Sequence, residues 1–86
     1  MSHYKLFLRL EAIEALKTVR GLQLRQISTF IDGLGRSPKT TGDYTERDDT
    51  DRTIEIKVVG QFAITFWADH AAKEIKVVDI RRADRA

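Results

Sequence analysis

The sequence contains no cysteine, one proline and only two histidines among its 86 residues. The absence of cysteine excludes disulfide bonds and thiolate metal sites, and it is typical of a reducing cytoplasm, where we expect this chain to act. No apolar run approaches the roughly 18 residues of a membrane-spanning helix, so we expect no membrane partner. With 42% hydrophobic and 33% charged residues, the composition predicts a single globular domain over residues 1–86.

The net charge of +2 is too small to indicate nucleic-acid binding by itself, but the charges are unevenly distributed. Residues 43–51 carry five acidic side chains and one arginine, whereas residues 81–86 carry three arginines and one aspartate. This polarity can favour an anionic ligand, although a solvated surface is the commoner reason for it. The acidic run lacks the central glycine and distal glutamate of a Ca²⁺ loop, so we expect no metal and no other cofactor.

The last third of the chain predicts three β-strands in succession. Apolar and polar residues alternate along Arg52–Val58 and along Phe62–Ala68. Lys73–Ile80 begins with the same alternation and then becomes continuously apolar, as a strand near the centre of a sheet does. The three segments together predict an antiparallel meander.

The turn at Gly60 leaves two registers open for the first two of these strands. A two-residue loop, Gly60-Gln61, suits a type II′ turn, but it places the apolar residues of the first strand on the same face as Trp67. An offset of three residues aligns them with Phe62 and Phe66 instead. Because a one-residue slip moves every side chain to the opposite face, we predict the odd offset or a bulge at Gly60. The apolar residues concerned are Ile54, Ile56 and Val58.

The first half of the chain predicts a strand followed by helices. His3–Arg9 alternates with period two, and from Leu10 onward the apolar residues recur at helical spacing. Gly21 interrupts that spacing, so either one broken helix or a helical hairpin fits. We favour two helices, Leu10–Val19 and Leu22–Leu34. The expected stop signals of the second are Gly33, Gly35 and Pro38.

These elements predict an α+β domain: an N-terminal strand, a helical hairpin and then an antiparallel β-meander. Tyr44–Arg47 is suited to a short edge strand. The helices are expected to cover one face of the sheet. The other face, with Glu55, Lys57, Thr65 and Trp67, is then expected to be open.

Few residues have chemistry that predicts a function. Trp67 on an open face can stack on a base or anchor a partner helix, although partial burial under the loop of residues 36–51 is the commoner explanation. His3 and His70 are the only neutral-pH bases, and polarity of a turn or terminus explains them more readily than catalysis does. The pair Gly33 and Gly35 ends a predicted helix, so it is no phosphate-binding loop.

The layout and the residues of the last thirty positions resemble the RelE/ParE superfamily of bacterial toxins. The resemblance rests on a short first strand, a helical hairpin that ends at Arg36-Ser37-Pro38, and the pattern RTIEIKVVGQFAITFWAD…KEIKVVDIRRADR. It implies a compact α+β fold and an antitoxin protein that wraps around the toxin. It also implies one of two activities, because RelE-like members cleave mRNA on the ribosome without a metal and ParE-like members inhibit DNA gyrase.

The resemblance implies Arg81 and Arg82, after the last strand, as candidate catalytic residues that hold the scissile phosphate. The predicted RNA-binding residues are Lys57, Trp67, Arg81, Arg82 and Arg85. Where Arg is typical after the glycine turn, this chain has Phe62-Ala63, and no Tyr or His follows Arg82. The favoured hypothesis is a RelE-like translation inhibitor. The alternatives are a ParE-like gyrase inhibitor and a non-catalytic protein-interaction module on the same fold.

Overall fold

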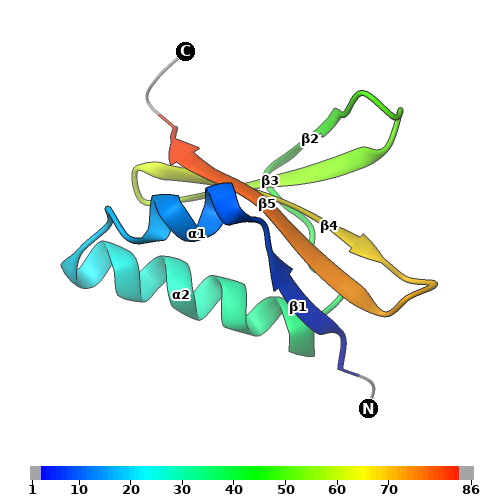
Figure 1. Cartoon of the computed structure of the whole chain (residues 1–86), viewed down its shortest axis with the longest axis horizontal. Coiled ribbons are helices and arrows are strands. Elements are labelled where there is room, and N and C mark those ends of the chain that lie inside the picture. Colours follow the sequence, from blue (N-terminus) through cyan, green and yellow to red (C-terminus); the bar gives the residue numbers. More distant parts are fainter. Residues whose placement is uncertain (1–2, 84–86) are drawn as a thin grey trace.

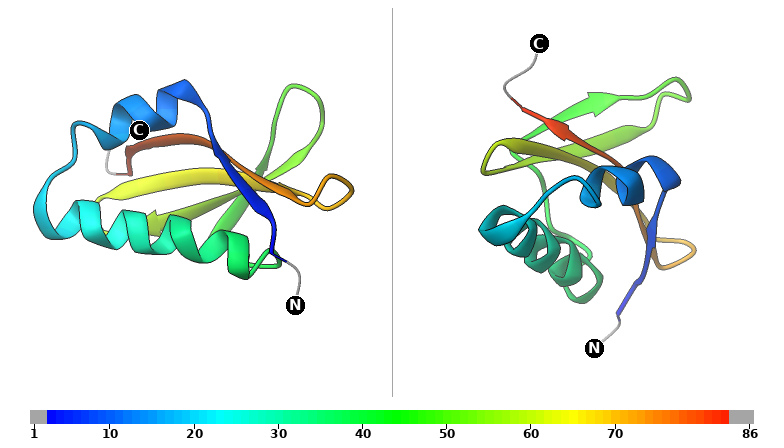
Figure 2. Two further views of the ribbon diagram at one scale, coloured as in Figure 1. Left: turned by 60° about the horizontal axis from the view of Figure 1, so that its bottom comes forward. Right: turned by 60° about the vertical axis from the view of Figure 1, so that its left-hand side comes forward.

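The chain folds into two helices that lie on one face of a five-stranded sheet (Figures 1 and 2). The structure is a computed structural model and describes residues 3–83. Its elements are β1 (Lys5–Leu8), α1 (Leu10–Leu16), α2 (Gly21–Arg36), β2 (Tyr44–Arg47), β3 (Thr53–Val59), β4 (Phe62–Asp69) and β5 (Glu74–Arg82). The predicted α+β class is confirmed.

The sheet has the strand order β1-β5-β4-β3-β2. Strands β2 to β5 form the predicted antiparallel meander, while β1 joins its far edge parallel to β5. The parallel pair is completed by a hydrogen bond of 2.9 Å from the Arg9 N–H to the Val77 carbonyl. The last strand of the sequence is therefore an interior strand of the sheet.

The helices depart from the prediction at their ends. Helix α1 stops at Leu16 instead of Val19, and α2 continues through Gly33 and Gly35 to Arg36. The two glycines are therefore not stop signals, and that prediction is wrong. Gly35 instead lets β1 approach the helix, since a Cβ there would lie 2.9 Å from the Tyr4 carbonyl oxygen. Proline chemistry does end α2, because the residue before Pro38 has left the helical region.

The hairpin between β3 and β4 uses the two-residue loop, so the predicted odd offset or bulge at Gly60 is wrong. Val59 pairs with Phe62, and Gly60 takes a φ of +61° that suits the first central position of a type II′ turn. Gln23 of α2 holds this loop from both sides. Its side-chain amide donates to the Val59 carbonyl at 3.3 Å and accepts from the Gln61 N–H at 3.2 Å.

This register places the side chains of β3 on the opposite faces of the sheet from those predicted. Cross-strand pairing places Ile56 beside Thr65 and Lys57 beside Ile64, so Glu55 and Lys57 are on the helix side of the sheet. Both tolerate that side because the β2–β3 hairpin extends beyond the helices (Figure 1). There Glu55 accepts a hydrogen bond of 2.8 Å from the Gly42 N–H, and Lys57 pairs with Asp43 at 3.3 Å.

The core lies between the helices and strands β1, β4 and β5. Phe30 of α2 and Phe66 of β4 join the two layers as an edge-to-face pair, with ring centroids 5.7 Å apart. β5 has a bulge where it pairs with Thr65 and Phe66, and the bulge interrupts the alternation of faces along its apolar residues. Val77, which pairs with Phe66, faces the helices. The buried core residues are Ala12, Val19, Ile27, Ile31, Leu34, Ile64, Phe66, Ile75, Val77 and Ile80.

We predict that Gly42→Ala destabilises the fold by about 2 kcal/mol or more, because the new methyl group would overlap the backbone of Ile56. The matched control is Gly33→Ala in the interior of α2, where nothing lies within 4 Å of the new atom. That change should stabilise by about 0.5–1 kcal/mol through helix propensity. Denaturant unfolding of the two variants measures both effects, and equal stabilities would contradict the close packing at Gly42.

Candidate functional site

A row of aromatic and cationic side chains crosses the sheet face opposite the helices, which we call the open face. The Arg52 guanidinium carbon lies 3.9 Å from the centroid of the Trp67 ring. The Lys76 ammonium lies 6.0 Å from the same ring and 5.3 Å from the ring of Phe7. Distances of this size allow cation–π attraction. Trp67 is therefore half-buried beneath a side chain, Arg52, that comes from the end of the loop before β3.

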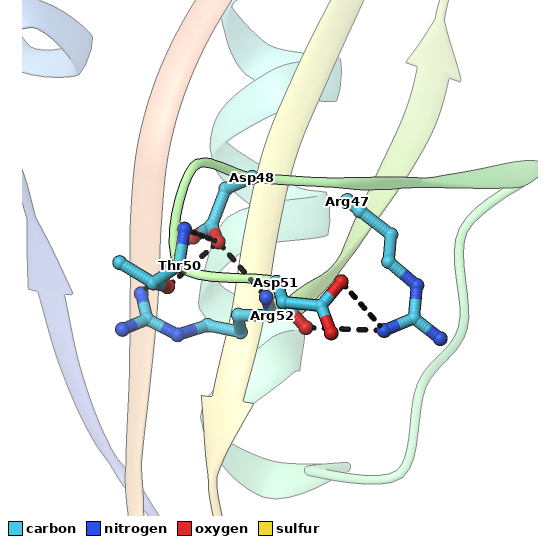
Figure 3. A network of polar contacts seen from close by, with 5 residues as sticks. All are labelled: Arg47, Asp48, Thr50, Asp51 and Arg52. Carbon is cyan, nitrogen blue, oxygen red and sulfur yellow. Dashed lines mark hydrogen bonds and ion pairs between the residues drawn. The ribbon is translucent and has the colours of Figure 1, made fainter.

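The turn between β2 and β3 fixes the position of Arg52 (Figure 3). The Asp48 carboxylate accepts hydrogen bonds from the Thr50 N–H at 2.9 Å, the Thr50 hydroxyl at 2.7 Å and the Arg52 N–H at 2.9 Å. Its second oxygen forms an ion pair of 3.4 Å with the Arg52 guanidinium. Asp51 closes the turn with a φ of +63° and pairs with Arg47 at 3.1 Å.

Two carboxylates beside β3 have lowered pKa values. For Asp48 the hydrogen bond from the Thr50 hydroxyl is the main cause of the lower pKa, followed by the Arg52 N–H. For Asp43 the main cause of the lower pKa is the hydrogen bond from the Val58 N–H, followed by the one from Lys57. Both groups are at the surface, so each acts chiefly by ordering the loop that carries it.

A cavity of about 440 Å³ lies between this turn and the open face. Its lining residues are Arg9, Asp48, Asp49, Thr50, Arg52, Ile54, Trp67, Lys76 and Val78. Three cationic side chains, Arg9, Arg52 and Lys76, surround the aromatic and aliphatic residues of this lining, and the carboxylates of Asp48 and Asp49 lie at one edge. Within residues 3–83, no group of three His, Asp or Glu side chains is placed to hold a metal ion.

The structure does not bring the predicted RNA-binding residues together. Trp67 and Arg81 lie on the open face, where Arg81 is 3.9 Å from Asp79. Lys57 and Arg82 lie on the helix side, and the Arg82 guanidinium donates to the Gln61 side chain at 3.1 Å. Arg85 lies outside the described residues. The candidate catalytic pair, Arg81 and Arg82, is thus divided between the two faces of β5.

Neither histidine contributes to the open-face cavity. The Nδ1 atom of His70 is 2.8 Å from the Tyr4 hydroxyl, and the two rings pack edge to face at 5.5 Å. His70 lines a different cavity, of about 500 Å³, beneath residues 38–41 beside Phe66. On the open face the Thr65 hydroxyl is buried and, among residues 3–83, has no hydrogen-bond partner.

Sequence reasoning missed three cations of the site: Arg9, Arg52 and Lys76. Arg9 and Lys76 alternate with core residues of β1 and β5, so their face could have been read from the strand pattern. The contribution of Arg52 could not have been read from that pattern, because it depends on how the β2–β3 turn folds over Trp67. The signal that would have helped is the two-residue Gly60-Gln61 loop, which places Ile54 and Trp67 on one face.

No known protein-family profile matches the chain, and no curated protein matches its sequence. Solved structures do match its fold. A chain of the archaeal RelE–RelB complex from Pyrococcus horikoshii has a TM-score of 0.80 at 17% identity, with 98% of this chain and 99% of that chain covered. The isolated E. coli RelE toxin has a TM-score of 0.67 at 11% identity, with 96% and 87% covered. The chain has the RelE fold.

Two further solved structures of toxins match the fold of this chain. The YoeB/ParE toxin from Agrobacterium tumefaciens has a TM-score of 0.68 at 12% identity, with 91% of this chain and 96% of that chain covered. A chain of the RelBE2 toxin–antitoxin complex from Mycobacterium tuberculosis has a TM-score of 0.75 at 16% identity, with 93% and 98% covered. At these identities the likeness establishes the RelE fold, and the chemistry has to be argued from this chain's own residues.

Among residues 3–83, neither helix has the length and apolar character needed to cross a bilayer.

We predict a pH-dependent change at Trp67 that reports on Asp48. Because folding lowers the pKa of Asp48, its carboxylate stabilises the turn fully above the ordinary value of 3.8 and loses this effect as the pH falls through the lowered pKa. The emission of Trp67, the only tryptophan, should therefore change with a midpoint below 3.8. Asp48→Asn should abolish that transition and the control Asp43→Asn should retain it. A transition that persists in Asp48→Asn would contradict the assignment.

Proposed function

We propose that the chain is the toxin component of a type II toxin–antitoxin module and that it inhibits translation by binding RNA on the open face. The observation that carries the proposal is the end-to-end match in fold, TM-score 0.80 over 98% of this chain, to a chain of a RelE–RelB complex. A fold match by itself is compatible with several functions. The choice among them rests on the side chains of the open face.

The open face supports RNA binding through complementary chemistry. Arg9, Lys76 and Arg81 supply positive charge for phosphates, and Trp67 with Arg52 over its ring supplies a stacking surface for bases. Lys57 and Arg82 would add contacts only to an RNA that passes around the sheet to the helix side. Cleavage would additionally require a group that transfers protons, and both histidines lie away from this face. We therefore propose that binding, and not general acid–base cleavage, is the main source of inhibition.

A second candidate function is inhibition by protein contact, as in a gyrase inhibitor or a non-catalytic interaction module. The observation that favours it is the apolar surface of the β2–β3 hairpin on the open face. Tyr44 is 51% exposed and Val58 is 38% exposed; the buried Ile56 pairs with Tyr44 and lies two residues before Val58 on β3. Such a surface suits a protein partner better than it suits a phosphate backbone.

The proposed antitoxin would cover the exposed apolar residues of the helices. Leu10 and Leu22 are each 66% exposed, and Ile13 of α1 is 39% exposed. Burial of such exposed apolar side chains against a protein partner is favourable. The antitoxin is proposed to be encoded by a short reading frame beside that of this chain, because its binding must follow toxin synthesis directly.

Induced expression of the chain in a bacterial host should arrest growth, with incorporation of labelled amino acids falling before that of labelled thymidine. Arg81→Ala should relieve the arrest, because loss of one charge-assisted phosphate contact weakens RNA binding by roughly tenfold or more. The matched control Lys57→Ala, on the other face and paired with Asp43, should arrest growth as the wild type does.

Three other results would change the assignment. Early loss of DNA supercoiling with translation intact would favour the gyrase inhibitor. Cut mRNA, mapped by its new 5′ ends, would show cleavage without a neutral-pH base on the open face. Normal growth with folded wild-type protein, and no capture of the neighbouring gene product, would contradict the toxin proposal.

A further inference from the structure

We propose that the outer face of the Arg52 guanidinium is a stacking platform for one unpaired RNA base, held in place by Trp67 beneath it. This inference rests on the proposed function and names the ligand of its cavity: a single-stranded segment of RNA whose base extends the Trp67–Arg52 stack. The base would be the third layer.

The geometry supplies the two lower layers of that stack. The Arg52 guanidinium carbon lies 3.9 Å from the centroid of the Trp67 ring, at stacking distance. Although it covers the ring, the Arg52 side chain keeps 42% of its surface exposed. The Arg52 side chain therefore lies over the Trp67 ring and remains accessible to a ligand. Bases in RNA complexes stack on guanidinium planes as well as on aromatic rings.

The platform is ordered before any ligand arrives. Asp48 holds Arg52 both at its backbone N–H, at 2.9 Å, and at its guanidinium, at 3.4 Å. The ion pair joins one nitrogen of the guanidinium, Nη1, to the Asp48 carboxylate. A long side chain normally loses rotamer freedom when it binds a ligand, and here much of that cost has been met by folding.

Two further cations in the same cavity suit the phosphates on either side of the stacked base. Arg9 and Lys76 both line the cavity with Arg52 and Trp67. The Arg9 side chain is 62% exposed, with Glu11 at 3.8 Å. The Lys76 side chain is 35% exposed and forms a pair of 3.3 Å with Glu74. The arrangement separates two tasks: Arg52, supported by Trp67, contacts a base, while Arg9 and Lys76 contact the backbone.

The experiment compares two RNAs that differ only in their bases. The full chain is titrated into a fluorescent 12-nucleotide single-stranded RNA of mixed sequence, and into an abasic oligonucleotide with the same phosphates, with fluorescence anisotropy as the readout. The wild type should bind the RNA roughly 5- to 100-fold more tightly than the abasic strand, the range expected for one stacked base.

Arg52→Lys keeps the charge and removes the plane, so it should remove most of that difference and leave affinity for the abasic strand nearly unchanged. Lys76→Gln should act in the opposite sense. It should weaken binding of both strands equally and lower the slope of log affinity against log salt by roughly 0.7. Unfolding curves of both variants verify that each remains folded.

The inference is overturned if Arg52→Lys weakens binding of both strands equally, if it weakens neither, or if the wild type binds neither strand. The first two outcomes leave the proposed function intact, whereas a wild type that binds neither strand would also contradict inhibition by RNA binding. The toxin role itself is reported by the growth assay, without reference to Arg52. Binding of RNA by a chain that does not arrest growth would retain the platform and remove the toxin role.

Discussion

The arrangement of the whole sheet depends on how α2 holds the turn at Gly60. One glutamine side chain, Gln23, bonds to the backbone on both sides of a two-residue loop, and it thereby sets which face each residue of β3 occupies. With one more residue in that loop, Lys57 would project onto the open face and Ile56 would leave it. A contact made by a helix on one side of the sheet thus determines the chemistry of the other side.

Much of the fold could be predicted from periodicity. Alternation in β3, β4 and β5 gave the meander, and the change of period at Leu10 gave the start of the helical region. The ends of the helices were less predictable. Gly35 looks like a stop signal, but it lies inside α2, where its lack of a side chain lets β1 approach closely. No local pattern reports a contact with a distant strand. The predicted register at Gly60 was wrong because it was chosen from burial alone, and the hydrogen bonds from the distant Gln23 could not be read from a local pattern.

The candidate site was predicted less well than the fold. Trp67 was found because an aromatic residue on the polar face of a sheet is unusual, whereas its cover, Arg52, was predicted only as the first residue of a strand. Its role follows from the turn that Asp48 organises and from the position of that turn over β4. Residues chosen as a basic set from a linear motif, such as Arg81 and Arg82, point to opposite faces because neighbours in a strand alternate.

The position of β5 inside the sheet affects how the molecule can be made. β5 follows the other six elements along the sequence, yet it separates β1 from β4 and supplies Ile75, Val77 and Ile80 to the core. Until it emerges, β1 has no strand to pair with, and the helices have only part of the surface on which they pack. Pairing between such distant segments is slow to form and leaves apolar surface exposed meanwhile. The native pairing of β1 and the complete core of this domain therefore form only after residues 74–82 have left the ribosome.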